Sequence, residues 1–375
     1  MKKNIYALMI AGVLTLSMCS CGGKIQETAN EIDGQANPVK EQEAEEQKSS
    51  DEQEASEKKS EVEGKAEPEN DTATEKESQN AQTDSLQDGE EGFSLENLKN
   101  HRFLFSSGAG AWGTTLVIHE DGSFSGEYSD SDMGDTGDGY PAGTVYQCDF
   151  TGQFTKPVMV NEYTYSMEIK ELNYEREPGT EEIKEDALYK YSTPYGLEDA
   201  KNILIYLPGA PLSELPEDFR GWVGYYDLSG TDETSLPFYA LNNESQQQGF
   251  SSYDLVEYWK TSISSVSERA DELENSITKD PLDQSELNEK SMELYNLWDG
   301  TLNILWKDLK QTRDTDTMEA LTNEERQWIE LKEQEMAKAG AEFEGGSMQP
   351  MLESLKGAEM TKERVYELME IFEKK

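Results

Sequence analysis

The densest group of side chains that could do chemistry lies between Ser129 and Pro141, where aspartates alternate with serine and glycine. Oxygen ligands of this kind are typical of calcium sites, and four carboxylates could gather around one ion: Asp130, Asp132, Asp135 and Asp138. The spacing differs from that of an EF-hand loop, because Gly134 stands where a ligand is needed and no glutamate closes the site. The segment is therefore interpreted either as a calcium site or as a solvated turn.

The rest of the chain contains no pattern typical of a catalytic or cofactor-binding site. Its two histidines, His101 and His119, fall in a region of expected strands. We find no HExxH, GxSxG or Walker A motif, and no GxGxxG motif between a strand and a helix. Carboxylates are so numerous that no acid/base pair stands out. We predict a protein that is not an enzyme and that needs no cofactor.

Residues 1–21 have the features of an export signal. Two lysines precede an uncharged apolar run from Ile5 to Met18, which is too short to span a membrane comfortably. The following segment resembles the lipobox of bacterial lipoproteins, with Cys21 as the expected lipidated residue and Cys19 as the alternative. Two acyl chains on that cysteine would anchor the protein at the extracellular face of the cell membrane. An ordinary cleaved signal peptide is the other interpretation.

The chain is strongly acidic, with a formal net charge of −45. This charge makes nucleic acid and anionic lipid surfaces poor partners and would attract a cationic one. Residues 22–92 contain no aromatic residue, and we expect them to form a disordered acidic tether because they cannot bury enough apolar surface. Cys148 is the one cysteine after the lipobox, so no internal disulfide is expected, and a small buried residue is the favoured interpretation.

Residues 93–243 have the texture of a β-rich domain. Short segments with alternating or β-branched residues are separated by Gly, Asp and Pro, and Asp121-Gly122 is typical of a hairpin turn. The segments expected as strands are 103–105, 114–118, 123–128, 144–150, 162–169 and 203–207. Their close spacing predicts a small antiparallel barrel or sandwich.

Residues 244–375 are predicted to form a helical domain. Apolar residues recur at intervals of three and four in four segments, which favours a small four-helix bundle. The expected helix starts are Asp280-Pro281 for the second helix and a capping box of Thr322 and Glu325 for the third. We expect the third helix to stop at Gly345-Gly346 and the fourth to break near Gly357. The predicted fold class is therefore α+β in two separate domains behind the tether.

The order of residues between Leu287 and Phe372 resembles the LprI-type lysozyme-inhibitor family. The positions that match the family pattern are Asp299, Asn303, Gln327, Trp328, Gly345, Gly346, Ser347, Pro350, Thr361 and Arg364. Two cysteines of many relatives are replaced here by Met336 and Lys356, and an arginine after the tryptophan is replaced by Lys332.

Most of these positions have a structural interpretation. We expect Trp328 to be the largest core residue of the bundle and Arg364 to reach an acidic partner such as Asp299. Gly345 and its neighbour Gly346 would allow a positive φ, and Ser347 could cap the following helix.

Together with the lipobox, the resemblance implies a lipid-anchored cell-surface protein, and the resemblance itself implies that its helical domain binds and blocks a cationic lysozyme. The alternative is a non-catalytic envelope module that binds peptidoglycan, another cell-wall component or a surface protein. A further hypothesis is a small-molecule pocket in the β-rich domain near Trp112.

Overall fold

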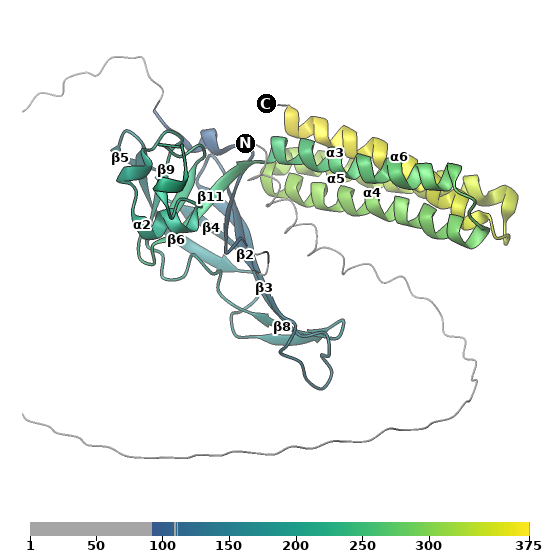
Figure 1. Cartoon of the computed structure of the whole chain (residues 1–375), viewed down its shortest axis with the longest axis horizontal. Helices are drawn as coiled ribbons and strands as arrows, with labels where there is room; N and C mark the ends of the chain where they lie inside the picture. Colours follow the sequence, from purple (N-terminus) through teal and green to yellow (C-terminus); the bar gives the residue numbers. More distant parts are fainter. Residues whose placement is uncertain (1–91, 109, 111, 375) are drawn as a thin grey trace, which may run out of the picture. The chain divides into compact units, whose positions relative to one another are not determined.

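The computed structural model describes residues 92–108, 110 and 112–374 (Figure 1). The predicted export signal, the lipobox cysteines Cys19 and Cys21, and the predicted tether therefore lie outside the described residues. An antiparallel β barrel followed by helices is present, as the sequence predicts.

Eight antiparallel strands form the barrel, and each pairs with the next along the chain. They are β1 (His101–Ser106), β2 (Gly113–Ile118), β3 (Ser123–Asp132), β4 (Thr144–Phe154), β6 (Thr164–Tyr174), β9 (Asn202–Tyr206), β10 (Ala240–Asn243) and β11 (Gln248–Asp254). The β1–β11 and β4–β6 pairings close the sheet on itself, which decides between the two architectures left open by the sequence.

On the edge away from β3, strand β4 has two different neighbours along its length. Its second half, Phe150–Phe154, pairs with β6 and completes the barrel. Its first half pairs in parallel with β8 (Ala187–Tyr191), which forms a hairpin with β7 (Glu181–Lys184). The short strand β5 (Val158–Asn161) adds to the other side of β6. Strands β3 and β4 therefore run beyond the closed part of the barrel.

The barrel interior is filled mainly by aromatic and aliphatic side chains. Phe124 lies opposite Gly152 across the β3–β4 pair, and Phe150 lies opposite Gly126. A Cβ atom added to either glycine would meet the facing phenylalanine ring at 2.2–2.5 Å, so the glycines provide the space for the rings. The 3-10 helix η1 (Leu95–Leu98) adds two buried leucines to the same core.

Cys148 lies in this interior, where burial raises the pKa of its thiol to about 12. The prediction that it is a buried cysteine is therefore confirmed. A smaller apolar cluster packs around α2 (Glu217–Trp222) and its buried Phe219, flanked by the 3-10 helices η2 (Leu212–Glu214) and η3 (Leu228–Gly230).

Four long helices follow the barrel and lie alongside one another (Figure 1). They are α3 (Leu255–Lys279), α4 (Gln284–Thr312), α5 (Thr315–Gly340) and α6 (Gln349–Glu373), with the 3-10 helix η4 (Ala341–Phe343) after α5. The buried apolar side chains of the main helical cluster come from α3, α4 and α6, and α5 adds only the partly buried Met318 and Trp328. In the described residues, no helix is long and apolar enough to cross a membrane.

Several predicted boundaries differ from those observed. The barrel strand β11 lies beyond residue 243, where the sequence placed the end of the β-rich domain. Helix α4 begins after Asp283, whose carboxylate caps it in a capping box with Glu286, and not at the predicted Asp280-Pro281. The predicted start at Thr322 is also wrong, because α5 begins after its N-cap residue Asp314.

Helix α5 ends at Gly340, before the predicted stop at Gly345-Gly346. Helix α6 continues through Gly357, where a break was predicted. A Cβ atom at this glycine would lie about 3 Å from the side chains of Met336 and Tyr295, so the residue permits close packing against α5 and α4. The glycine serves helix contact and not helix termination.

The barrel and the helices are joined by continuous chain and by a buried ion pair. Asp254, the last residue of β11, caps α3 by accepting hydrogen bonds from the backbone N–H groups of Val256 and Glu257. Arg102 of β1 donates to Asp308 of α4 at 2.6 Å, and both side chains are buried.

Candidate functional site

Helix α5 is attached to its neighbours largely through charged side chains. Its buried residues are Leu321, Glu325, Lys332 and Gly340. A helix normally docks by an apolar stripe, and here two of the four buried positions carry charge. The surroundings of Glu325 and Lys332 therefore decide how this helix is positioned.

Arg364 of α6 forms the centre of the first group. Its Nε atom donates to Glu325 Oε2 at 2.8 Å, and its Nη1 atom donates to Glu324 Oε1 at 2.7 Å and Glu367 Oε2 at 2.8 Å. Burial acts to lower the pKa of Arg364, but the three carboxylates raise it overall. Burial raises the pKa of Glu325, and the arginine acts in the opposite direction. This guanidinium is thus a permanent cation that connects α5 to α6.

Lys332 of α5 forms the centre of the second group, and its partners come from α4. Its Nζ atom donates to Tyr295 Oη at 2.9 Å and to Asp299 Oδ1 at 3.1 Å. The Trp328 ring lies next to both groups, 5.0 Å from Lys332 Nζ and 5.9 Å from the guanidinium carbon of Arg364. We call these residues and the carboxylates around Arg364 the charge cluster.

The charge cluster corrects two expectations. Arg364 does not pair with Asp299, because Lys332 lies at that carboxylate and the arginine is engaged by glutamates of α5 and α6. Trp328 is only partly buried, and Trp298 is the largest fully buried side chain. The reason is that Trp328 covers the charged seam of α5, whereas Trp298 faces the apolar centre shared by α3, α4 and α6.

Another part of the predicted signature forms the turn between α5 and α6. Gly345 has φ of +72°, and its N–H donates to Gln349 Oε1 at 2.8 Å. Ser347 accepts a hydrogen bond from Asn288 through its carbonyl oxygen, but the N-cap position of α6 is Met348, so the capping role predicted for the serine is wrong. Pro350 lies in the first turn of α6.

Four signature residues remain to be placed. Gly346 does not have the positive φ expected of it, and its N–H donates to the carbonyl oxygen of Phe343 at 2.8 Å. Asn303 donates to the carbonyl and side chain of Asp299 one turn earlier on α4. Thr361 is fully buried on α6. Gln327 is exposed on α5, and its side chain has no hydrogen bond to any described residue. Among the signature residues, Gln327 is therefore the one whose side chain makes no interaction that would explain its presence by the stability of the fold.

The outer face of α5 is acidic, and two apolar side chains, Ile329 and Leu331, are exposed on it. Ile329 is 40 % exposed, and Glu330 and Glu333 lie within one turn of it, both exposed. Neither glutamate has an ion-pair partner in the described part of the chain. This face adjoins Gln327 and offers charge and apolar surface to a partner.

The four aspartates proposed as calcium ligands do not converge. Asp135 binds the Thr144 hydroxyl at 2.9 Å and Lys190 Nζ at 3.2 Å, whereas Asp132 accepts backbone N–H groups of its own turn. Asp130 faces a cavity in the barrel, and Asp138 is exposed. Among the described residues there is no group of three or more His, Cys, Asp or Glu that could hold a metal ion.

Sequence reasoning named Glu325 and Lys332, but it missed that both are buried and ion-paired. A signal for them exists, because the spacing of Leu321, Trp328 and Met336 continues through both positions at intervals of three and four. Charged residues within an apolar stripe indicate buried ion pairs when complementary charges are available on neighbouring helices.

The charge cluster, the α5–α6 turn and the helix contacts at Gly357 all belong to one continuous segment. Residues 278–368 match the family model described as lysozyme inhibitor LprI. The LprI region thus spans α4, α5 and most of α6, and it excludes the barrel and nearly all of α3. It contains 21 acidic and 11 basic residues, a net charge of −10. No curated protein and no solved structure matches the chain.

Proposed function

We propose that the chain is a lipid-anchored cell-surface protein whose LprI region binds and inhibits a cationic lysozyme. The match over residues 278–368 is the observation that carries this proposal. The anchor would be a diacylglycerol on Cys21, or on Cys19, and the residues between this anchor and the barrel would act as a tether at the extracellular face of the membrane.

The contact surface proposed within the LprI region is the outer face of α5. Gln327 is a signature residue that the fold leaves exposed, and Glu330 and Leu331 follow it at i+3 and i+4 on the same side of the helix. Ile329 and Glu333 are exposed farther round the same helix. The buried charge cluster on the opposite face keeps α5 in place, so its outer face is available without rearrangement. Acidic side chains without partners would increase the association rate with a basic protein.

The test uses the chain from residue 22 onward and measures inhibition of a basic lysozyme on cell-wall substrate at low and moderate salt. We expect inhibition that weakens as salt rises, because the Debye length shortens to about 8 Å at physiological ionic strength. The Gln327→Ala variant should inhibit less without a change in thermal stability, because the Gln327 side chain is exposed and has no hydrogen bond or ion pair with a described residue.

A double charge reversal on α5, compared with an equal reversal elsewhere, tests whether inhibition depends on the position of the acidic residues or only on the net charge. Glu330→Lys with Glu333→Lys should weaken inhibition about tenfold or more. The matched control is Glu268→Lys with Asp271→Lys on α3, which changes the net charge equally at exposed positions outside residues 278–368. Equal losses in both variants would reject α5 as the contact surface. No inhibition by the unmodified chain would reject the function, and retention on purified cell wall in that case would favour the envelope-module alternative.

A further inference from the structure

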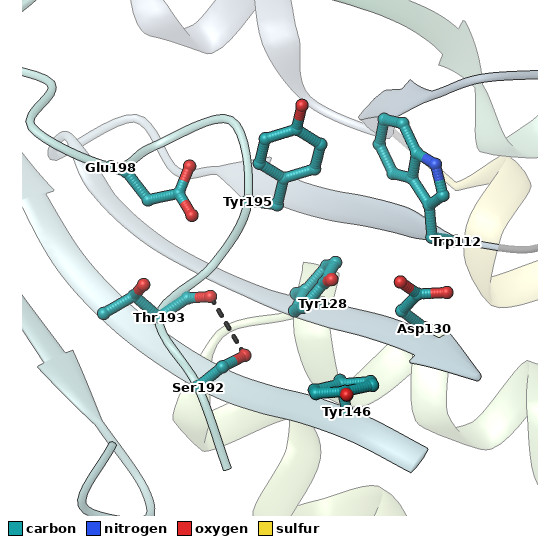
Figure 2. A pocket seen from close by; sticks show the side chains of 8 residues that line it. All are labelled: Trp112, Tyr128, Asp130, Tyr146, Ser192, Thr193, Tyr195 and Glu198. Atoms are coloured by element: carbon teal, nitrogen blue, oxygen red, sulfur yellow. Dashed lines mark hydrogen bonds between the residues drawn. The ribbon is translucent and has the colours of Figure 1, made fainter. Parts of the chain in front are cut away.

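A second candidate site lies in the barrel, and none of its lining residues belongs to the LprI region. It is a cavity of about 300 Å³ between the protruding ends of β3 and β4 and the segment 192–198 that follows β8 (Figure 2). Its lining residues are Trp112, Tyr128, Asp130, Tyr146, Ser192, Thr193, Tyr195 and Glu198. Four of the eight are aromatic and two are carboxylates.

The position of these residues follows from the barrel's alternation. On β3, Phe124, Gly126, Tyr128 and Asp130 point to the same side, because side chains of a strand alternate between faces. Phenylalanines fill the closed part of the interior, and tyrosine and aspartate replace them where the strands extend beyond it. Asp130 pairs across the strands with Tyr146, which brings a carboxylate and a ring to the cavity together. The interior thus changes from apolar to aromatic and acidic along one strand.

The aromatic walls support one another. The Tyr195 and Trp112 ring centroids lie 4.9 Å apart, and the Tyr195 and Tyr128 centroids lie 6.5 Å apart at an interplanar angle of 70°. Thr114 donates a hydrogen bond to the carbonyl oxygen of Tyr195. The rings thus hold one another at tilted or edge-on angles around the cavity. An aromatic ring attracts a cation that approaches its face, where the quadrupole is negative.

The segment that carries Tyr195 and Glu198 is fixed by a buried side chain. Asn243, which is fully buried, donates to the carbonyl oxygens of Gly196 at 3.0 Å and Glu198 at 3.3 Å. Gly196 has φ of +97° and lies against Phe105, so no larger residue would fit there. These contacts position the two lining residues before any ligand binds.

The charged side chains that line the cavity are all acidic. The eight lining residues, all in the described part of the chain, include Asp130 and Glu198 and no lysine or arginine. Lys190 lies over the Tyr146 ring, but it is ion-paired with Asp135 and does not line the cavity. Burial raises the pKa of Tyr128, and the negative charges of Asp130 and Glu198 raise it further, as expected if both carboxylates are close to the phenol.

We infer that this cavity binds a small organic cation, an ammonium group attached to a compact apolar body. The ammonium would lie against the aromatic faces and between the carboxylates, where cation–π attraction and charge act in the same direction. The volume is at the lower end of the range for ligand pockets, which suits a small molecule and not a folded partner. An anionic or purely apolar ligand would leave both carboxylates without a counter-charge.

The test measures binding of choline by calorimetry to the chain from residue 22 onward, which contains every described residue. We expect binding, and we expect 3,3-dimethylbutan-1-ol, the neutral isostere of choline, to bind at least about tenfold more weakly, because only its charge differs. n-Butylamine distinguishes a primary from a quaternary ammonium as the preferred form. Equal binding of the isostere, or no binding of either ammonium compound, would overturn the inference.

Two variants test whether choline binds in this cavity. Glu198→Gln keeps the shape of the side chain and should weaken choline binding about tenfold. The control is Asp199→Asn, at an exposed neighbouring position that does not line the cavity, and it should bind choline as the unmodified chain does. A loss of affinity in both variants, or in neither, would show that the cavity is not the binding site. The inhibition assay on lysozyme is independent of these measurements, because the cavity lies outside residues 278–368.

Discussion

The barrel core and the α5 interface bury their side chains by opposite chemistry. In the barrel, phenylalanines fill space left by glycines on the facing strand, and the interior becomes polar only at the cavity. On α5, the buried positions include Glu325 and Lys332, which are matched by Arg364 and Asp299 from two other helices. Apolar packing tolerates many partners of the right size, whereas buried charges require a specific one.

This difference indicates which contacts determine the position of a structural element in this chain. A misplaced α5 would leave charges buried without partners, which is more costly than a poorly filled apolar contact. The LprI region includes this interface and excludes the barrel. We therefore interpret its signature largely as a device that fixes the position of one helix and its outer face.

The largest expected loss of stability comes from a substitution in the apolar barrel core. Phe124→Ala should lower the free energy of unfolding by about 3–5 kcal/mol, because the ring is almost fully buried and lies over Gly152. Urea unfolding followed by near-UV circular dichroism measures it. Replacement by leucine should recover part of the loss, since volume matters more than shape in such a core. A loss below about 1 kcal/mol would show that the surrounding side chains can fill the space left by the Phe124 ring.

The charged side of the comparison predicts a loss that a second substitution reverses. Arg364→Ala should cost about 3 kcal/mol, because it leaves Glu325 buried beside Trp328 without its cation. Arg364→Met combined with Glu325→Leu should return stability close to that of the unmodified chain, since an apolar pair can replace a buried ion pair. The measurement is urea unfolding followed by far-UV circular dichroism. If the double variant is no more stable than Arg364→Ala, the ion pair is not what makes the single change costly.

The smallest expected effect concerns pH and the first turn of α5. Asp314 accepts hydrogen bonds from the Thr317 hydroxyl and backbone N–H, and these lower the pKa of the carboxyl. A lowered folded-state pKa means that the stabilisation is present above the unfolded value of about 4 and is lost as the pH falls through the folded value. Asp314→Asn retains the cap without the titration.

The difference in melting temperature between the unmodified chain and Asp314→Asn should therefore change below about pH 4 and be constant above it. Thermal melts over a pH series measure that difference. A constant difference at all pH values would mean that the ionised carboxylate contributes nothing beyond the cap geometry.

The sequence by itself determined most of the order of strands and helices, but it did not predict the barrel strands β10 and β11. Six of the expected strand segments coincide with β1, β2, β3, β4, β6 and β9, and four helices follow. The glycine at the β2–β3 turn, Gly122, has φ of +84°, as the Asp-Gly pair predicts. These features are local, since alternation, helical spacing and turn chemistry are all readable within a few residues.

Only the tertiary structure decided which of these elements meet. The sequence left barrel and sandwich open, because closure depends on β4 pairing with β6 and β1 with β11, and the latter pair joins opposite ends of the domain. It also could not show that Glu325 and Lys332 lie inside, because a charged residue in a stripe is buried only if a partner on another helix compensates it. Arg364 is that partner for Glu325, 39 residues away along the chain.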